Sequence, residues 1–105
     1  MPRRPCPRTI SHSPPATFFK PAGIPMRDLE EVSLAADEME ALRLADFEGL
    51  YHEDAAQRMG VSRQTFDRII RRARRKVSEA LVHGRALRIE KQDPGRGEEP
   101  AAPSA

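Results

Sequence analysis

The chain has 105 residues and a mass of 11.8 kDa, which is enough for one small domain. Hydrophobic residues make up 38% of it and aromatic residues 5%, with no tryptophan, so little apolar material is present to line an enclosed substrate cavity and an enzyme is disfavoured. The net charge of +2 is unevenly distributed: residues 1–27 hold five bases and no acid, residues 28–58 ten acids and two bases, and residues 59–91 ten bases and three acids. Such blocks favour a basic face that meets a polyanion over charge pairing within the fold.

The N-terminal segment predicts an extended arm, residues 1–33. Residues 1–25 contain seven of the ten prolines, which fix φ and remove backbone donors. Residues 8–10 and 17–20 are candidate strands, and Phe18, Phe19 and Ile24 are expected to pack on the domain.

Targeting signals are not evident in the sequence. Cys6 has no cysteine partner, and no signal-peptide-like apolar stretch follows the basic start, which together favour a reducing cytoplasm. No apolar run reaches the roughly 20 residues that a membrane span requires, so we expect a soluble protein without a membrane partner.

Helical periodicity dominates residues 34–90 and predicts a small, mainly α domain. The first helix is expected to start at Asp37, with Glu40 completing a capping box, and to end at Gly49. A short helix over 52–59 stops at Gly60, and a long helix capped by Ser62 runs to Gly84. Residues 86–90 are a candidate strand that pairs with the arm, and the tail 91–105 is expected to be disordered. The expected core residues are Met39, Leu42, Leu44, Ala45, Ala55, Ala56, Met59, Phe66, Ile69, Ile70, Ala73, Val77 and Leu81.

The stretch from residue 52 to residue 71 predicts a helix-turn-helix. Ala55 and Ala56 allow close helix contact, and Gly60 suits the turn between the helices. Val61 fills the gap between them, while Phe66 anchors the second helix to the core. Several suitable residue types at fixed offsets make this a fairly specific pattern.

The outward face of the third helix has the chemistry of a recognition helix for double-stranded DNA. Gln pairs with adenine, Arg with guanine O6 and N7, and the Thr methyl group contacts thymine. The residues expected to contact bases are Arg63, Gln64, Thr65 and Arg68. Those expected to contact phosphates are Arg71, Arg72, Arg75 and Lys76. A solvated helix face is the alternative, and adjacent like charges argue against it.

Catalytic and metal sites find little support in the sequence. Cys6, His12, His52 and His83 lack metal-binding spacing, and no cofactor motif is present. We expect His52 to open the second helix facing solvent or phosphate and His83 to cap the end of the third. Six acids lack a nearby nucleophile and base, and are interpreted as a solvated face. They are Glu38, Glu40, Asp46, Glu48, Glu53 and Asp54.

Four segments resemble a prokaryotic family of uncharacterised, predicted DNA-binding proteins, over about residues 3–90. They are Lys20-Pro-Ala-Gly-Ile-Pro, Arg43-Leu-Ala-Asp-Phe-Glu-Gly-Leu-Tyr-His-Glu-Asp-Ala-Ala, Met59-Gly-Val-Ser-Arg-Gln-Thr-Phe and Arg71-Arg-Ala-Arg-Arg-Lys-Val. The family's helix-turn-helix is similar to region four of bacterial sigma factors, which implies that Arg63, Gln64 and Arg68 approach the major groove. Two departures are Asp67, where the family has a small residue, and fewer basic and cysteine residues near the start. We expect Asp67 to pair with Arg63 or Arg71, and the alternative is that it accepts a hydrogen bond from a cytosine amine.

The sequence therefore predicts a transcriptional regulator that is not an enzyme. Because one such motif makes few base contacts, specificity is expected to need a homodimer on paired half-sites. The alternative is a module that uses its acidic face to contact RNA polymerase or other transcription machinery. A third interpretation is binding of structured RNA, which a preference for duplex DNA over RNA would exclude.

Overall fold

The computed structural model describes residues 9–11 and 13–91. Its elements in chain order are β1 (Phe18–Phe19), the 3-10 turn η1 (Met26–Asp28), β2 (Glu31–Leu34), α1 (Ala36–Leu42), the π-helical segment η2 (Arg43–Phe47), α2 (His52–Met59), α3 (Arg63–His83) and β3 (Ala86–Ile89). The predicted tail lies almost entirely outside the described residues, as do Arg8, Cys6 and His12.

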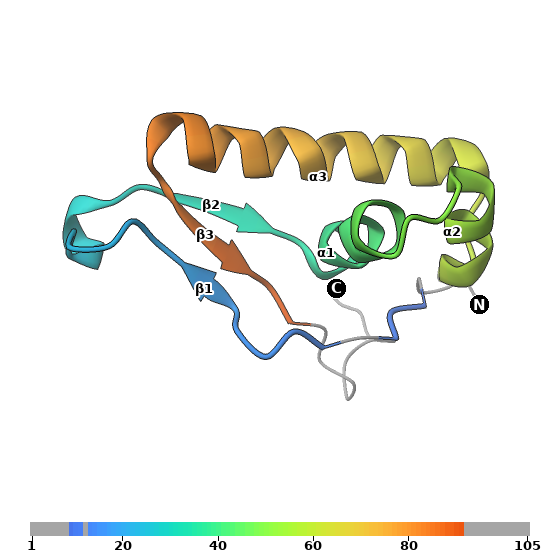
Figure 1. The fold of residues 1–105 in the computed structure, drawn as a ribbon, viewed down its shortest axis with the longest axis horizontal. Helices are drawn as coiled ribbons and strands as arrows, with labels where there is room; N and C mark the ends of the chain where they lie inside the picture. The colour runs from blue at the N-terminus through green and yellow to red at the C-terminus, as the bar shows by residue number, and fades with distance from the viewer. Residues whose placement is uncertain (1–8, 12, 92–105) are drawn as a thin grey trace, which may run out of the picture.

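The long helix α3 spans one side of the domain (Figure 1). The small sheet lies along its C-terminal half, whereas α1 and α2 lie toward its N-terminal half. Strand β3 is central in the order β1-β3-β2, antiparallel to β1 and parallel to β2. The predicted pairing of the C-terminal strand with the arm is confirmed by the register of Phe18 opposite Arg88. The sequence interpretation missed β2, and the candidate strand at residues 8–10 is not formed at Thr9 or Ile10.

The first helix begins earlier than predicted and changes from α to π geometry before it ends. Its N-cap is Ala35 rather than Asp37, and the Glu38 carboxylate, not that of Glu40, accepts a 2.8 Å hydrogen bond from the Ala35 N–H. Helix α1 passes into a wider π turn, in which the Glu48 N–H donates to the Arg43 carbonyl at 2.8 Å. The predicted end at Gly49 is confirmed, since its φ of 77° suits glycine and breaks the helix.

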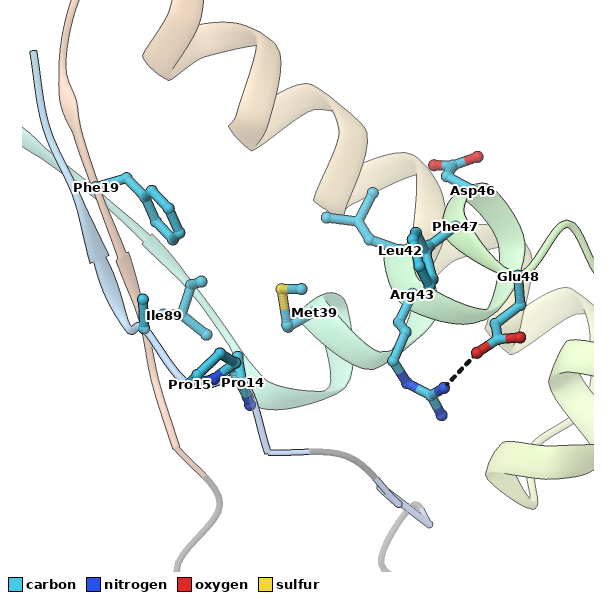
Figure 2. Close-up of a pocket in the computed structure, with 11 residues that line it drawn as sticks. Pro14, Pro15, Phe19, Met39, Leu42, Arg43, Asp46, Phe47, Glu48 and Ile89 are labelled. Carbon is cyan, nitrogen blue, oxygen red and sulfur yellow. Dashed lines mark hydrogen bonds and ion pairs between the residues drawn. The ribbon is translucent and has the colours of Figure 1, made fainter.

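A groove lies between the arm and strand β3 on one side and α1 and η2 on the other. Figure 2 shows Phe19, Ile89, Pro14 and Pro15 on one side of this groove, whose volume is about 590 Å³, and Met39 and Leu42 on the other. Phe19 remains 53% exposed, so it only partly packs on the domain as expected.

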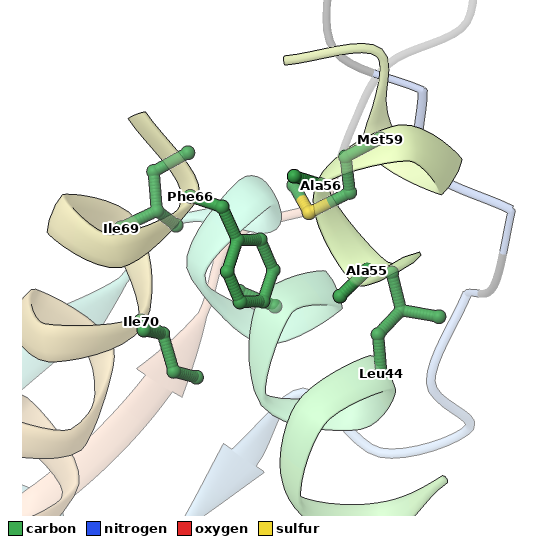
Figure 3. Close-up of a cluster of buried hydrophobic side chains, with 8 residues drawn as sticks. Leu44, Ala55, Ala56, Met59, Phe66, Ile69 and Ile70 are labelled. Atoms are coloured by element: carbon green, nitrogen blue, oxygen red, sulfur yellow. The ribbon is translucent and has the colours of Figure 1, made fainter. Parts of the chain in front are cut away.

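The apolar core lies where α1, η2, α2 and the start of α3 meet. Figure 3 shows Phe66 between Ile69 and Ile70 of its own helix and Met59, Ala55 and Ala56 of α2, with Leu44 below. A second cluster of Leu34, Ala73 and Ile89 joins α3 to the sheet. Most predicted core residues are buried or half-buried. Leu81 is the exception: it is 78% exposed, because the buried stripe of α3 continues through Ala80 instead.

Candidate nucleic-acid interface

Two local features fix the junction between α2 and α3, namely the glycine that ends α2 and the serine that caps α3. Gly60 ends α2 in the left-handed conformation, with a φ of 70°, as the sequence predicted. Ser62 caps α3, since its Oγ accepts a 3.1 Å hydrogen bond from the Thr65 N–H. The Val61 N–H donates to the Ala56 carbonyl at 3.0 Å, which ties the connection to α2. The start of α3 is therefore held in a defined position against α2.

The outer face of α3 carries a stripe of four exposed polar residues, which we call the outer stripe: Gln64, Arg68, Arg71 and Arg75. Their spacing of four, three and four residues places them on one side of the helix, opposite the buried Phe66. Among the described residues, the three arginines of this stripe form no ion pair with an acid. Their charges are therefore available to an external anion.

The other two predicted base-contacting residues flank this stripe. The Arg63 side chain is 62% exposed, and its Nε lies 3.9 Å from the Asp67 carboxylate. Thr65 is half-buried, and its hydroxyl oxygen accepts hydrogen bonds from Ser62 at 3.0 Å and from Arg68 at 3.4 Å. The hydroxyl of Thr65 thus belongs to the helix cap, while Arg63 is open to solvent.

Three of the basic side chains of α3 form ion pairs with acids of α1 and η2. The Glu38 carboxylate accepts hydrogen bonds from Arg72 Nε at 2.9 Å and from Lys76 Nζ at 2.8 Å. Arg74 makes two hydrogen bonds to Asp46, at 2.7 and 3.1 Å. Charge pairing within the fold, which the sequence interpretation disfavoured, therefore occurs on both flanks of the helix. Arg72 and Lys76, predicted to contact phosphates, already have a protein partner.

Glu38 and Glu40 are not part of a solvated face, contrary to the prediction, because they are 1% and 3% exposed. Burial raises the pKa of the Glu38 carboxyl, but the hydrogen bonds from Lys76, Ala35 and Arg72 outweigh burial and hold its pKa below the usual value. The apolar periodicity of the sequence could not predict that Glu38 is buried and paired. Its partners on α3, Arg72 and Lys76, lie 34 and 38 residues further along the chain.

Glu40 holds the arm against α1. Its Oε2 accepts hydrogen bonds from the Ser11 N–H at 3.2 Å, from Ser11 Oγ at 3.1 Å and from Arg43 Nη2 at 2.9 Å. Burial raises the pKa of Glu40, but the hydrogen bonds from Arg43 and Ser11 outweigh burial and hold its pKa below the usual value. Arg43 also reaches Glu48 at 3.0 Å. No sequence signal pointed to this contact.

Asp67 pairs with Arg63, as the sequence predicted, and makes a closer contact with His52 that the sequence did not predict. Its carboxylate lies 2.8 Å from His52 Nδ1, and Arg63 is a distant second partner. The His52 ring also meets the Phe66 ring edge-on, with centroids 5.2 Å apart. His52 therefore links α2 to α3 rather than simply facing solvent, whereas His83 is exposed at the end of α3, where Gly84 caps the helix.

Metal clusters and membrane-spanning helices are both absent from the described part of the chain. Within residues 9–11 and 13–91, no three His, Cys, Asp or Glu side chains are grouped as a metal site requires. None of the described helices combines the length and the apolar composition needed to cross a bilayer.

Comparison with known proteins places the chain in a family. It is similar to proteins named UPF0251 from Moorella thermoacetica (58% identity over 90 residues) and from Desulforudis audaxviator (59% over 90 residues), each alignment covering 86% of this chain. The chain spans about 60% of the length of these curated relatives. No solved structure matches it. Residues 1–95 match the family described as "Protein of unknown function DUF134", and the chain belongs to that family.

Proposed function

We propose that the protein binds double-stranded DNA, with the N-terminal half of α3 in the major groove, and regulates transcription. The observation that carries this proposal is the outer stripe. Its arginines are exposed and unpaired within the described part of the chain, although acids neutralise Arg72, Arg74 and Lys76 on the flanks. Like charges on one helix face repel one another, and an external polyanion removes that repulsion.

The dimensions of the stripe divide its members into two roles. At about 1.5 Å of rise per residue, Gln64 and Arg68 lie about 6 Å apart along the axis, within a major groove about 12 Å wide. Arg75 lies about 16 Å from Gln64 on the same scale, beyond the width of the groove. We therefore assign base contacts to Arg63, Gln64 and Arg68, and a phosphate contact to Arg75. Arg71 lies about 10 Å from Gln64 on the same scale, near the edge of the groove, and we assign it to a phosphate as well.

The fold provides the rigid support that base recognition requires. Phe66 and Ile69, which alternate with the stripe, are 0% and 1% exposed and fix the helix to α1 and α2. The Ser62 cap stabilises the first turn, where the base-contacting residues lie. The helix-turn-helix interpretation is supported by this arrangement of α2, residues 60–62 and α3.

Selection from a random duplex pool tests the proposal. We expect a recovered motif, and we expect Arg68→Ala to weaken binding to it by about 5- to 150-fold, the value of one bidentate arginine–guanine contact. Arg27→Ala is the matched control, because Arg27 is an exposed arginine in η1, far from the start of α3 (Figure 1). The absence of duplex binding at low salt would refute the proposal, and a preference for duplex RNA would transfer it to RNA.

A single recognition helix reads few base pairs, so we also propose that the protein acts as a homodimer. The selected motif is then expected to be a palindrome whose half-sites are about 10 base pairs apart, one DNA turn. Sedimentation of the protein with and without this duplex measures the stoichiometry. One protein bound per asymmetric site would contradict the dimer and leave DNA binding intact.

A second candidate function is contact with RNA polymerase, and exposed aromatic residues favour it. Phe47 and Tyr51 are 83% and 81% exposed on either side of Gly49. The neighbouring Glu48 and Glu53 are also exposed, so aromatic and acidic groups share this surface. Aromatic side chains are enriched at protein interfaces. The double variant Phe47→Ala/Tyr51→Ala should lose binding to purified polymerase and keep its affinity for duplex DNA; retained polymerase binding would reject this surface.

A further inference from the structure

A chain of three polar side chains joins the start of α2 to the start of α3. His52 Nδ1 lies 2.8 Å from Asp67 Oδ1, and Asp67 Oδ2 lies 3.9 Å from Arg63 Nε. A carboxylate accepts hydrogen bonds, so the Nδ1–H of His52 is the donor in the first contact. Asp67 and Arg63 are four residues apart, a spacing at which side chains on one helix meet. Each oxygen of the Asp67 carboxylate therefore has a partner of its own.

Asp67 is the fixed member of the pair that it forms with Arg63. The His52 ring packs edge-on against the buried ring of Phe66, with centroids 5.2 Å apart, so the core holds the histidine in place. The half-buried carboxylate of Asp67 is held in turn by this ring. The Arg63 side chain is 62% exposed and is the flexible partner. Asp67 can therefore orient Arg63, whereas Arg63 has little influence on the position of Asp67.

The nitrogen of Arg63 that faces Asp67 determines which donors remain for a ligand. Nε is the guanidinium nitrogen in this contact, which leaves the two terminal Nη groups for an external acceptor. Two parallel donors of this kind match guanine O6 and N7. A hollow of about 460 Å³ beside Arg63 is also lined by Glu53, but no ion pair joins Glu53 to Arg63 in the described part of the chain. Asp67 is thus the acid that orients this arginine.

We propose that Asp67 is a positioning residue that determines the base preference of Arg63. By holding Nε, it directs the Nη groups toward a guanine in the major groove and keeps the guanidinium from turning to a neighbouring phosphate. This inference rests on the proposed function and names the residue that sets one position of the DNA sequence. It differs from a direct contact between Asp67 and a cytosine amine, for which the carboxylate would need a free oxygen.

The first test compares base preference with affinity for unrelated DNA. Asp67→Ala should lower the preference for guanine at one position of the selected duplex by at least about 5-fold, the low end of the value of one bidentate arginine–guanine contact. The freed Arg63 can bind a phosphate, so the slope of log K against log salt for an unrelated duplex should become steeper by about 0.9. Alanine favours the helix, so the variant should fold, which circular dichroism checks.

The matched control is Asp54→Ala, which removes an exposed acid of α2 that does not contact Arg63 and should leave the guanine preference unchanged. A purely structural role for Asp67 would weaken binding to the selected and the unrelated duplex equally. That result, or an unchanged guanine preference in Asp67→Ala, would overturn the inference and leave the proposed function standing.

A double-mutant cycle with Arg63 tests whether Asp67 acts through that arginine. Arg63→Ala alone should remove the guanine preference, and Arg63→Ala/Asp67→Ala should be no less selective than Arg63→Ala. Additive losses would show that Asp67 contacts a base itself, such as a cytosine amine, and would overturn the inference. No duplex binding by the wild-type protein would refute the proposed function together with this inference.

Discussion

Replacement of Glu38 by Ala should destabilise the domain by about 3 kcal/mol, because it removes an acceptor from three buried or half-buried hydrogen bonds. The donors are Lys76 Nζ and the Ala35 N–H, each at 2.8 Å, and Arg72 Nε at 2.9 Å. Loss of the hydrogen bond at the helix start costs about 1 kcal/mol. The two cations add about 1 kcal/mol each, below the usual range for charged partners, because Arg72 and Lys76 are 53% and 33% exposed and regain water.

Urea unfolding followed by circular dichroism measures this change. Glu38→Gln keeps an oxygen for the Ala35 N–H and loses the charge, so it should cost less than Glu38→Ala. The control is Glu53→Ala, an exposed acid in the first turn of α2, which should cost under about 1 kcal/mol. A loss below about 0.5 kcal/mol for Glu38→Ala would show that the ion pairs do not hold α1 to α3.

The pH dependence of the free energy of unfolding gives an independent check of the lowered pKa of Glu38, because the direction of the change is defined. The pKa of Glu38 is lowered in the folded protein, so its charge stabilises the fold above the unfolded pKa, about 4.3. The stability difference between wild type and Glu38→Gln should therefore be constant from neutral pH to about pH 5.5 and should shrink as the pH falls through the folded pKa. A difference that persists unchanged at pH 3 would contradict the lowered pKa.

Three further substitutions test the rest of the fold through the same unfolding measurement. Phe66→Ala should cost about 3–5 kcal/mol, because a 0% exposed ring leaves a cavity between α2 and α3; a loss under about 1.5 kcal/mol would mean that the core refills. Ser62→Ala should cost about 1 kcal/mol through the Thr65 N–H, whereas Ser62→Asp should not, since aspartate also caps. Leu81→Ala should change stability by less than about 0.5 kcal/mol, because the side chain is in solvent, and a core-like loss would place Leu81 in an interface.

Local signals explain why the helical part of the fold could be predicted. Gly60, Ser62 and Gly84 mark helix ends through φ values and caps that depend only on neighbouring residues. Strand β2 was harder to detect, although Val32 and Leu34 alternate with exposed residues, because four residues give a weak period-two pattern. The pairing of β2 with β3 joins segments more than fifty residues apart, so no turn sequence between the two strands indicates that they pair.

The candidate site was predictable in outline for a similar reason. The outer stripe of α3 follows from helical spacing and the buried face, so Gln64 and Arg68 were found from periodicity alone. Arg72 and Lys76 have the same residue chemistry, yet the fold pairs them with Glu38. Only the packing of α1 against α3 distinguishes these paired cations from the exposed ones, because the acid and its partners are far apart in sequence.

The difference between the paired cations on the flanks of α3 and the exposed cations of the outer stripe limits how this helix can bind a polyanion. Its flank cations are neutralised by α1 and η2, so the charge that remains exposed is concentrated in one line along the helix instead of surrounding it. A line of charge favours one orientation of the helix toward a polyanion, whereas cations on every side would attract without orienting. Glu38 and Asp46 therefore hold the flank cations of α3 and, in the proposed DNA complex, also set the direction in which α3 faces DNA. Glu38→Gln should accordingly free Arg72 and Lys76 to add phosphate contacts, so the slope of log K against log salt should become steeper by up to about 1.8 while the selected motif becomes less distinct. A slope that does not become steeper in this variant would show that Glu38 does not restrain the two cations.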